Sequence, residues 1–253
     1  MFQYYVGAFS FIMLQGANRT LLIRDGNKNT DLAGTPVFYK GKPVMTARVE
    51  NPWEKEYARK GRVWGGAVHN LPALSRGERV LELGCGNGKT FAALLERGCV
   101  VTGIDISLSA TVLCRSQVFT RTMGEVAVAD ACFLPFTAGT FDAVVAFHVI
   151  GHLREKDRKN AVEEIARVLR PGGTLFFSGF SREDFRAGQG TESEPWTFAR
   201  KNGIATHYFT EDEVRSLTGS RFCGECKTHT WDLTVRGKRF PRAEITGQFN
   251  RVL

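Results

Sequence analysis

The central part of the chain alternates two kinds of hydrophobic pattern. Continuous apolar runs, typical of buried strands, occupy residues 79–84, 99–105, 125–130, 141–149 and 174–180. Between these runs, residues 89–97, 108–122 and 155–169 place apolar side chains three or four positions apart, which predicts amphipathic helices. Strands that alternate with helices form a mainly parallel sheet with helices on both faces. The pattern therefore predicts a doubly wound α/β fold.

The regular alternation stops after residue 180. Residues 181–209 are polar, contain glycines and carry interspersed aromatic side chains, so we expect a variable lid over the substrate there. Thr210 and Glu213 have the spacing of a capping box, which predicts that a short helix begins at this point. Two strand-like runs then flank residues 236–239, and this arrangement is typical of an antiparallel hairpin at a sheet edge.

Residues 1–44 differ in character from the rest of the chain. They combine an apolar start with a turn-rich stretch of glycine, asparagine and aspartate. We expect an N-terminal extension over 1–44, either a short β-rich appendage or a segment upstream of the true start at Met45, and one domain over 45–253. Residues 2–14 are too few to span a bilayer as a helix, and no basic segment precedes them as in a signal peptide. These features predict a cytoplasmic protein without a membrane anchor.

The net charge of +8 is concentrated at the two ends of the chain. Residues 1–44 hold five basic and two acidic residues, and residues 236–251 hold five basic residues and one acidic residue. The body is therefore nearly neutral, which argues against a domain that binds nucleic acid over its whole surface. A local phosphate-binding patch on the C-terminal hairpin stays open as an alternative.

The six cysteines lie mostly in apolar runs, as expected for reduced thiols in a cytoplasmic protein. Cys223 and Cys226 have the C-x-x-C spacing, but no second pair of cysteines or histidines at zinc spacing accompanies them. We therefore expect no metal site.

The strongest chemical signal is a glycine-rich loop between a strand and a helix. Residues 80–90, VLELGCGNGKT, contain Gly84, Gly86 and Gly88 directly after the first strand. Glycines allow a tight turn and a close approach of the backbone to a ligand, and the N–H groups at the start of the next helix favour a carboxylate or phosphate. The spacing is G-x-G-x-G rather than the G-x-G-x-x-G of NAD and FAD sites.

Two aspartates follow at the ends of the next two strands. Asp105 can accept hydrogen bonds from both hydroxyls of a ribose; its alternative role is to cap the next helix, which Ser107 can do instead. Asp130 can accept a hydrogen bond from the amino group of an adenine, with apolar walls from residues 132–134. Strand ends meet at one edge of such a sheet, so the order of these groups predicts a nucleoside-like ligand.

Residues 80–177 resemble the class I S-adenosylmethionine (AdoMet)-dependent methyltransferases, in the broad "type 11" group that includes enzymes of ubiquinone and menaquinone biosynthesis. The matching segments are VLELGCGNG, GIDIS, ADACFLPF, FDAVVAFHVIGHL, EEIARVLRPGGTLFF and YFTEDEVRSL. The resemblance implies a Rossmann-like, seven-stranded sheet with the last strand antiparallel, and AdoMet as cofactor. The cofactor-binding residues expected on this basis are Glu82, Gly84, Cys85, Gly86, Gly88, Asp105, Ile106, Asp130, Ala131, Phe147 and His148.

A looser resemblance concerns the segment before the first strand. Tyr57 and Trp64 lie where many methyltransferases have a segment that folds over AdoMet, and aromatic rings there would contact the cationic sulfonium. The alternative is that residues 52–60 form an amphipathic helix that only packs on the core.

Methyl transfer is an in-line displacement, so the protein mainly aligns the reactants and excludes water. A general base is needed only when the acceptor atom is protonated at neutral pH. His148, at the end of the fourth strand, is the first candidate for this base, and His207 is a further one. His152, four residues after His148, is expected to pack in the core. No [DNS]-P-P-[FYW] motif and no Pro-Cys dipeptide occur, which disfavours exocyclic amines of nucleic-acid bases and the C5 position of pyrimidines as acceptors.

Three functions remain open at this point. The compact core and nearly neutral body favour a methyltransferase that acts on an O, N, S or C atom of a small molecule. The alternative is a methyltransferase for tRNA or protein, supported by the basic hairpin and by a loose likeness of residues 141–177 to wobble-uridine tRNA methyltransferases. From another class, the chain could be a non-catalytic AdoMet-binding accessory subunit.

Overall fold

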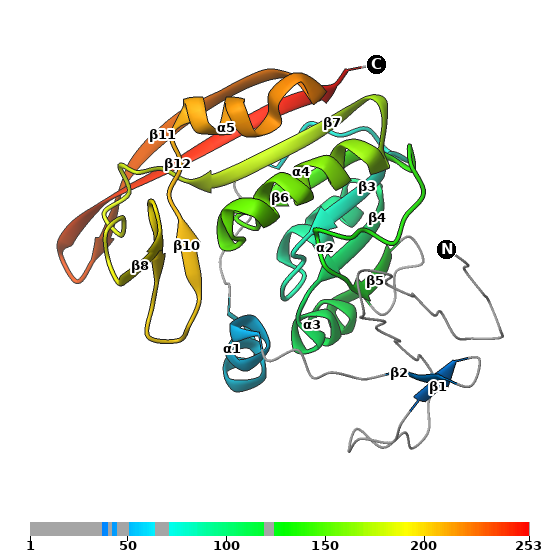
Figure 1. Cartoon of the computed structure of the whole chain (residues 1–253), viewed down its shortest axis with the longest axis horizontal. Coiled ribbons are helices and arrows are strands. Elements are labelled where there is room, and N and C mark those ends of the chain that lie inside the picture. The colour runs from blue at the N-terminus through cyan, green and yellow to red at the C-terminus, as the bar shows by residue number, and fades with distance from the viewer. Residues whose placement is uncertain (1–36, 40–41, 45–50, 64–70, 119–123, 253) are drawn as a thin grey trace.

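A computed structural model of the chain describes residues 37–39, 42–44, 51–63, 71–118 and 124–252. Its main feature is a seven-stranded sheet with the order β11-β12-β7-β6-β3-β4-β5 (Figure 1). The strands are β3 (Arg79–Leu83), β4 (Val100–Asp105), β5 (Gly124–Val128), β6 (Phe141–Phe147), β7 (Leu169–Phe180), β11 (Phe222–Val235) and β12 (Lys238–Arg251).

The pairing of the strands confirms the fold class predicted from the sequence. Strands β3 to β7 pair in parallel, whereas β12 runs antiparallel to both of its neighbours, β7 and β11. The strand order reverses between β3 and β6, and ligands of doubly wound sheets bind at the carboxyl ends of the strands at such a point. The hairpin of β11 and β12 lies at the sheet edge as expected, with β11 outermost.

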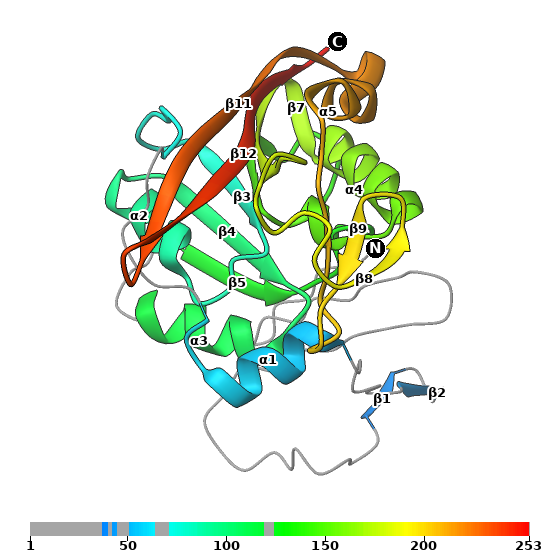
Figure 2. The ribbon, with the colours of Figure 1, turned by 90° about the vertical axis from the view of Figure 1, so that its left-hand side faces the viewer.

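Helices cover both faces of the sheet, as Figure 2 shows. The helices are α1 (Pro52–Lys60), α2 (Lys89–Glu96), α3 (Leu108–Val118), α4 (Glu155–Val168) and α5 (Glu211–Thr218), with 3-10 turns η1 (Ile150–His152) and η2 (Gly219–Arg221). Helix α2 packs on β4 and α3 on β4 and β5, whereas α4 packs on β7 and α5 on β11. Helix α5 begins at the predicted cap, where the Thr210 hydroxyl accepts a hydrogen bond from the backbone N–H of Glu213.

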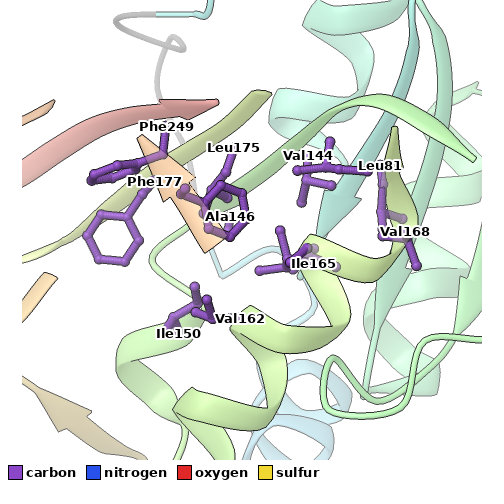
Figure 3. Packing of buried hydrophobic residues seen from close by; sticks show 14 of the residues in the cluster. Leu81, Val144, Ala146, Ile150, Val162, Ile165, Val168, Leu175, Phe177 and Phe249 are labelled. Carbon is purple, nitrogen blue, oxygen red and sulfur yellow. The ribbon is translucent and has the colours of Figure 1, made fainter. Parts of the chain in front are cut away.

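The core consists of two apolar clusters separated by the sheet. Side chains alternate along β6, so Val144 and Ala146 face α4 and α5 in the larger cluster, which Figure 3 shows. Ala143 and Val145 point to the other face and pack in the cluster that includes Phe91 of α2. A sheet buried on both faces explains why its central strands are continuous apolar runs.

Residues 181–209 are more ordered than their composition suggests. They contain the short strands β8 (Thr191–Glu194), β9 (Thr197–Ala199) and β10 (Ala205–His207), which pair as a separate antiparallel sheet. The sequence does not predict this sheet, because its strands are polar and each has only three or four residues.

Most of the predicted N-terminal extension lies outside the described residues. Within it, the backbone of β1 (Val37–Tyr39) pairs with that of β2 (Lys42–Val44) as a small antiparallel hairpin. None of the helices in the described ranges is long and apolar enough to cross a membrane.

Candidate active site

A cavity of about 1510 Å³ lies at the carboxyl ends of the parallel strands and extends over β7 and the C-terminal hairpin. Most residues predicted to bind the cofactor line it together: Tyr57, Glu82, Gly84, Cys85, Gly86, Asp105, Ile106, Asp130, Ala131, Phe147 and His148. Gly88 and His207 do not line this cavity, and Trp64 lies outside the described residues. The topology of the sheet thus brings together groups that are far apart in the sequence.

The glycine-rich loop has the backbone that its sequence predicts. Gly86 has a φ of +53°, and a Cβ atom at this position would lie 2.5 Å from the hydroxyl oxygen of Tyr57. Gly88, the N-cap of α2, has a φ of +82°, and a Cβ there would lie 3.0 Å from the Cα of Cys114 in α3. Gly86 therefore leaves room at the cavity wall, whereas Gly88 allows the close packing of α2 on α3.

Asp105 joins the glycine-rich loop to the end of β4. Its carboxylate accepts hydrogen bonds from the backbone N–H groups of Gly86, at 3.0 Å, and Ser107, at 2.9 Å. Burial raises the pKa of Asp105 to about 6, although these hydrogen bonds act in the opposite direction. The hydroxyl of Ser107, not Asp105, accepts from the backbone N–H of Ala110 in the first turn of α3. The alternative role of Asp105 as a helix cap is therefore taken by Ser107.

The surroundings of Glu82 indicate which kind of ligand fits the cavity. Its side chain is buried, and its Oε2 atom has no hydrogen-bond partner among the described residues. Burial, with a smaller contribution from Asp105, raises the pKa of Glu82 well above its ordinary value. Two buried carboxylates beside one cavity favour a ligand that brings positive charge and hydrogen-bond donors. AdoMet has a sulfonium, an ammonium group and ribose hydroxyls, so the residues fit it.

Asp130, which the sequence predicts to contact the adenine, lines the cavity after the end of β5. Its carboxylate accepts a hydrogen bond from the backbone N–H of Cys132, at 2.9 Å, which fixes the turn after β5. Cys132 and Phe133 line the cavity beside it, so an apolar wall adjoins the carboxylate as expected.

Helix α1 folds over the glycine-rich loop. The carboxylate of Glu54 accepts hydrogen bonds from the hydroxyls of Ser107 and Ser109, at 2.7 and 2.6 Å, which fix α1 to the start of α3. Tyr57, in the same helix, is buried with its hydroxyl against Gly86. The helix therefore packs on the domain and also closes one side of the cavity.

His148 is held in an unusual conformation at the end of β6. Its φ is +56°, in the left-handed region that non-glycine residues rarely occupy outside functional sites and turns. Its Nε2 atom lies 3.1 Å from the hydroxyl oxygen of Ser178 and 3.2 Å from Oε2 of Glu244, and its ring stacks on Phe180 at 4.4 Å. The buried Nδ1 atom has no partner within the described ranges.

Glu244 is a site residue that the sequence reasoning missed. It lies on β12, far from the cofactor motifs, and reaches the cavity because β12 is inserted beside β7. The only signal for its position was that side chains alternate along a strand, so that residues 242, 244, 246 and 248 share one face.

His207 and His152, the other two histidines considered from the sequence, have structural partners. The ring of His207 is buried between the hydroxyl of Thr197, at 2.8 Å from Nδ1, and the carboxylate of Glu213, at 2.6 Å from Nε2. His152 lines the cavity, but its Nδ1 bonds the carbonyl of Ala205 at 2.7 Å, and burial lowers its pKa to about 4. His152 is therefore neutral at physiological pH, and the geometry favours His148 over both as the acceptor of a proton.

Comparisons with known proteins agree with this geometry. Residues 81–177 match a family model described as a methyltransferase domain. The match is therefore to a methyltransferase domain, over the strands and helices that carry the cavity. This match agrees with the predicted enzyme class for residues 81–177, and the cavity has residues that fit the predicted cofactor, AdoMet.

Curated relatives of this domain act on different acceptors. The chain is 32% identical over 159 residues to the tRNA N(3)-methylcytidine methyltransferase Mettl2 of Drosophila melanogaster, covering 57% of this chain and 48% of that protein. It is 34% identical over 125 residues to the 27-O-demethylrifamycin SV methyltransferase of Amycolatopsis mediterranei, covering 48% of this chain and 45% of that protein. The chain therefore spans about half the length of these relatives.

Among solved structures, a SAM-dependent methyltransferase from Methanosarcina mazei has the same fold. The two share 24% identity with a TM-score of 0.62, and the match covers 74% of this chain and all of that one.

Proposed function

We propose that this protein transfers the methyl group of AdoMet to an oxygen atom of a small molecule. The observation that carries the proposal is that one cavity is lined both by buried carboxylates beside the glycine-rich loop and by a histidine–carboxylate pair. Glu82, Asp105 and the glycine-rich loop form the first, and His148 with Glu244 forms the second. Donor and acceptor would thus meet near the end of β6.

The residues divide into those that bind the donor and those that act on the acceptor. Glu82 would neutralise positive charge on AdoMet, Asp105 would accept from its ribose, and Asp130 would accept from its adenine. AdoMet supplies a methyl group already activated by the sulfonium, so the protein needs only to align the acceptor and remove its proton. Because a carboxylate only accepts hydrogen bonds, Nε2 of neutral His148 carries the hydrogen that faces Glu244, and Nδ1, which has no partner in the part of the chain that the structure describes, would take the proton. Glu244 would stabilise the resulting imidazolium at a distance of 3.2 Å.

The acceptors named for several relatives support an oxygen atom as the acceptor of the methyl group. The relatives include the 27-O-demethylrifamycin SV methyltransferase and two fungal O-methyltransferases, from Aspergillus nomiae and Penicillium expansum. A base is also needed for a hydroxyl acceptor, whereas a thiolate or a neutral amine can react without one.

tRNA is the second candidate acceptor, because one feature of the structure favours it. The turn of the C-terminal hairpin exposes Arg236, Lys238 and Arg239, which together form a small basic tip. Several relatives are named as tRNA methyltransferases, including the Drosophila protein. Exposed charges of this kind also protect a sheet edge from pairing with other strands, so the tip alone is weaker support than the cavity.

The proposal is tested in two steps. Calorimetry first measures AdoMet binding to the wild-type protein and to the Asp105→Ala variant, for which we expect weaker binding. Methyl-labelled AdoMet is then incubated with the protein and a cell extract separated into small molecules, RNA and protein. Label in the small-molecule fraction that is lost in His148→Asn supports the proposal. Label in RNA favours the second candidate, AdoMet binding with no label in any fraction favours an accessory subunit, and no AdoMet binding contradicts all three.

A further inference from the structure

Next to the His148–Glu244 pair, two arginines in the cavity wall share one carboxylate. Asp184 is buried; its Oδ1 lies 2.8 Å from Nε of Arg186 and its Oδ2 lies 2.7 Å from Nε of Arg242. Burial alone would raise the pKa of Asp184, but the hydrogen bonds from the two guanidinium groups outweigh it and lower the pKa. Asp184 is therefore ionised, and a single negative charge faces two positive charges.

Both guanidinium groups keep donors that Asp184 does not use. Each has five N–H donors, and Asp184 accepts from Nε of both and from Nη2 of Arg186. Both residues line the cavity, although their side chains are only 16% and 14% exposed. Glu244, two residues from Arg242 on β12, bonds to His148 and not to either guanidinium. This part of the wall therefore keeps guanidinium N–H donors that Asp184 does not use, largely withdrawn from bulk water.

Aromatic rings fix the arginines close to the proposed base. The Cζ atom of Arg186 lies 4.0 Å from the centroid of the Phe180 ring, and that of Arg242 lies 5.4 Å from the rings of Phe180 and Trp231. The same Phe180 ring stacks on His148. The Phe180 ring is thus a common neighbour of His148 and of both arginines. Such stacking restrains a guanidinium plane while its N–H edge stays available.

We propose that the methyl acceptor carries a carboxylate that binds to Arg186 and Arg242. A carboxylate matches the paired N–H donors of a guanidinium group. An acceptor with both a hydroxyl and a carboxylate would contact His148 and the arginines within one cavity. The proposal rests on the function proposed above, since it concerns the same cavity.

A small carboxylate fits this site better than a backbone phosphate of RNA. Phosphates of a nucleic acid bind to side chains that reach out from the surface, as Arg236 and Arg239 do at the tip of the hairpin. Arg186 and Arg242 instead lie inside the cavity wall, held by Asp184.

Calorimetry on protein saturated with S-adenosylhomocysteine tests the proposal. The probes are para-hydroxybenzoate and its neutral analogue para-hydroxybenzamide, which differ only in the anionic group. We expect the acid to bind at least about tenfold more tightly than the amide, because hydrogen bonds to charged groups contribute about 1.5–3 kcal/mol. Arg186→Met and Arg242→Met should each remove most of this preference. Arg236→Met, at the exposed tip, is the matched control and should keep it.

Each single variant leaves Asp184 with one arginine, so we expect both to fold, and unchanged affinity for S-adenosylhomocysteine will verify this. Arg242→Lys, which keeps the charge and loses the planar fork, should retain part of the preference. Equal binding of acid and amide to the wild-type protein would overturn the proposal, and so would a preference that survives in both methionine variants. Salt-sensitive tRNA binding that Arg242→Met abolishes would overturn it in favour of RNA. Failure to bind S-adenosylhomocysteine would instead contradict the proposed function.

Discussion

Replacing Asp105 with asparagine is expected to change how the stability of the ligand-free protein depends on pH. Burial raises the pKa of Asp105 from 3.8 to about 6 in the folded protein. Because the folded state holds this proton more tightly, the contribution of the group to stability is complete below its unfolded pKa and is lost as pH rises through about 6. A shift of about two pKa units costs the wild-type protein about 3 kcal/mol at neutral pH.

Urea unfolding of both proteins between about pH 4.5 and about pH 7 measures this cost. Over that interval, the free energy of unfolding of Asp105→Asn should rise relative to the wild type by about 2 kcal/mol. The amide offers one acceptor oxygen for the N–H groups of Gly86 and Ser107, so the variant also loses about 1 kcal/mol, but this loss is the same at every pH. The change with pH therefore isolates the titration of Asp105.

Asp142 provides a control of opposite sign. Hydrogen bonds from the backbone of Arg79 and the side chain of Arg170 outweigh burial and lower its pKa. Its contribution to stability is therefore present at neutral pH and is lost as pH falls. As pH rises, the free energy of unfolding of Asp142→Asn should fall relative to that of the wild type. If the pH profiles of Asp105→Asn and the wild type were parallel, the buried-carboxylate argument would be wrong.

Three further predictions concern other parts of the structure. Glu244→Gln should leave AdoMet affinity unchanged in calorimetry but lower kcat by about tenfold to a hundredfold and shift the pH–rate profile; equal losses in both measurements would contradict a role in positioning the base. His207→Ala should lower the free energy of unfolding by about 2–4 kcal/mol in urea without weakening AdoMet binding, and reduced AdoMet affinity would instead place this residue in the site. Gly86→Ala should destabilise the protein more than Gly219→Ala, since both have a φ of +53° but only the first would meet a neighbour, Tyr57. Equal losses of stability in the two variants, measured by thermal unfolding, would show that the contact with Tyr57 does not affect stability.

The donor half of the site could be predicted from the sequence because its signals are local. Gly84 and Gly86 follow β3 within a few residues, Asp105 is the last residue of β4, and strand ends of a parallel sheet meet at one edge. The alternation of strands and helices was therefore enough to predict that these groups lie at the same edge of the sheet. The glycine-rich loop and the two aspartates therefore line one cavity in the structure as expected.

The acceptor half could not be predicted in the same way, since it depends on long-range pairing. Glu244 and Arg242 reach the cavity only because β12 pairs with β7, and a shift of the register by one residue would turn both to the other face. No local feature of the sequence around His207 predicted its hydrogen-bond partners. Its contacts with Thr197 and Glu213 join the small sheet to α5, an arrangement that its polar sequence surroundings do not reveal.

The insertion of β12 between β7 and β11 also determines the order in which the molecule can assemble. Both neighbours of β12 precede it in the sequence, so during synthesis the donor half can fold while β7 and β11 each still have an unpaired edge. Exposed strand edges are sites of aggregation, and closing them requires contacts between residues far apart in the chain, which form slowly. Arg242 and Glu244 lie on this last strand, so nascent chains should form the part of the cavity at the glycine-rich loop before they form the part lined by β12.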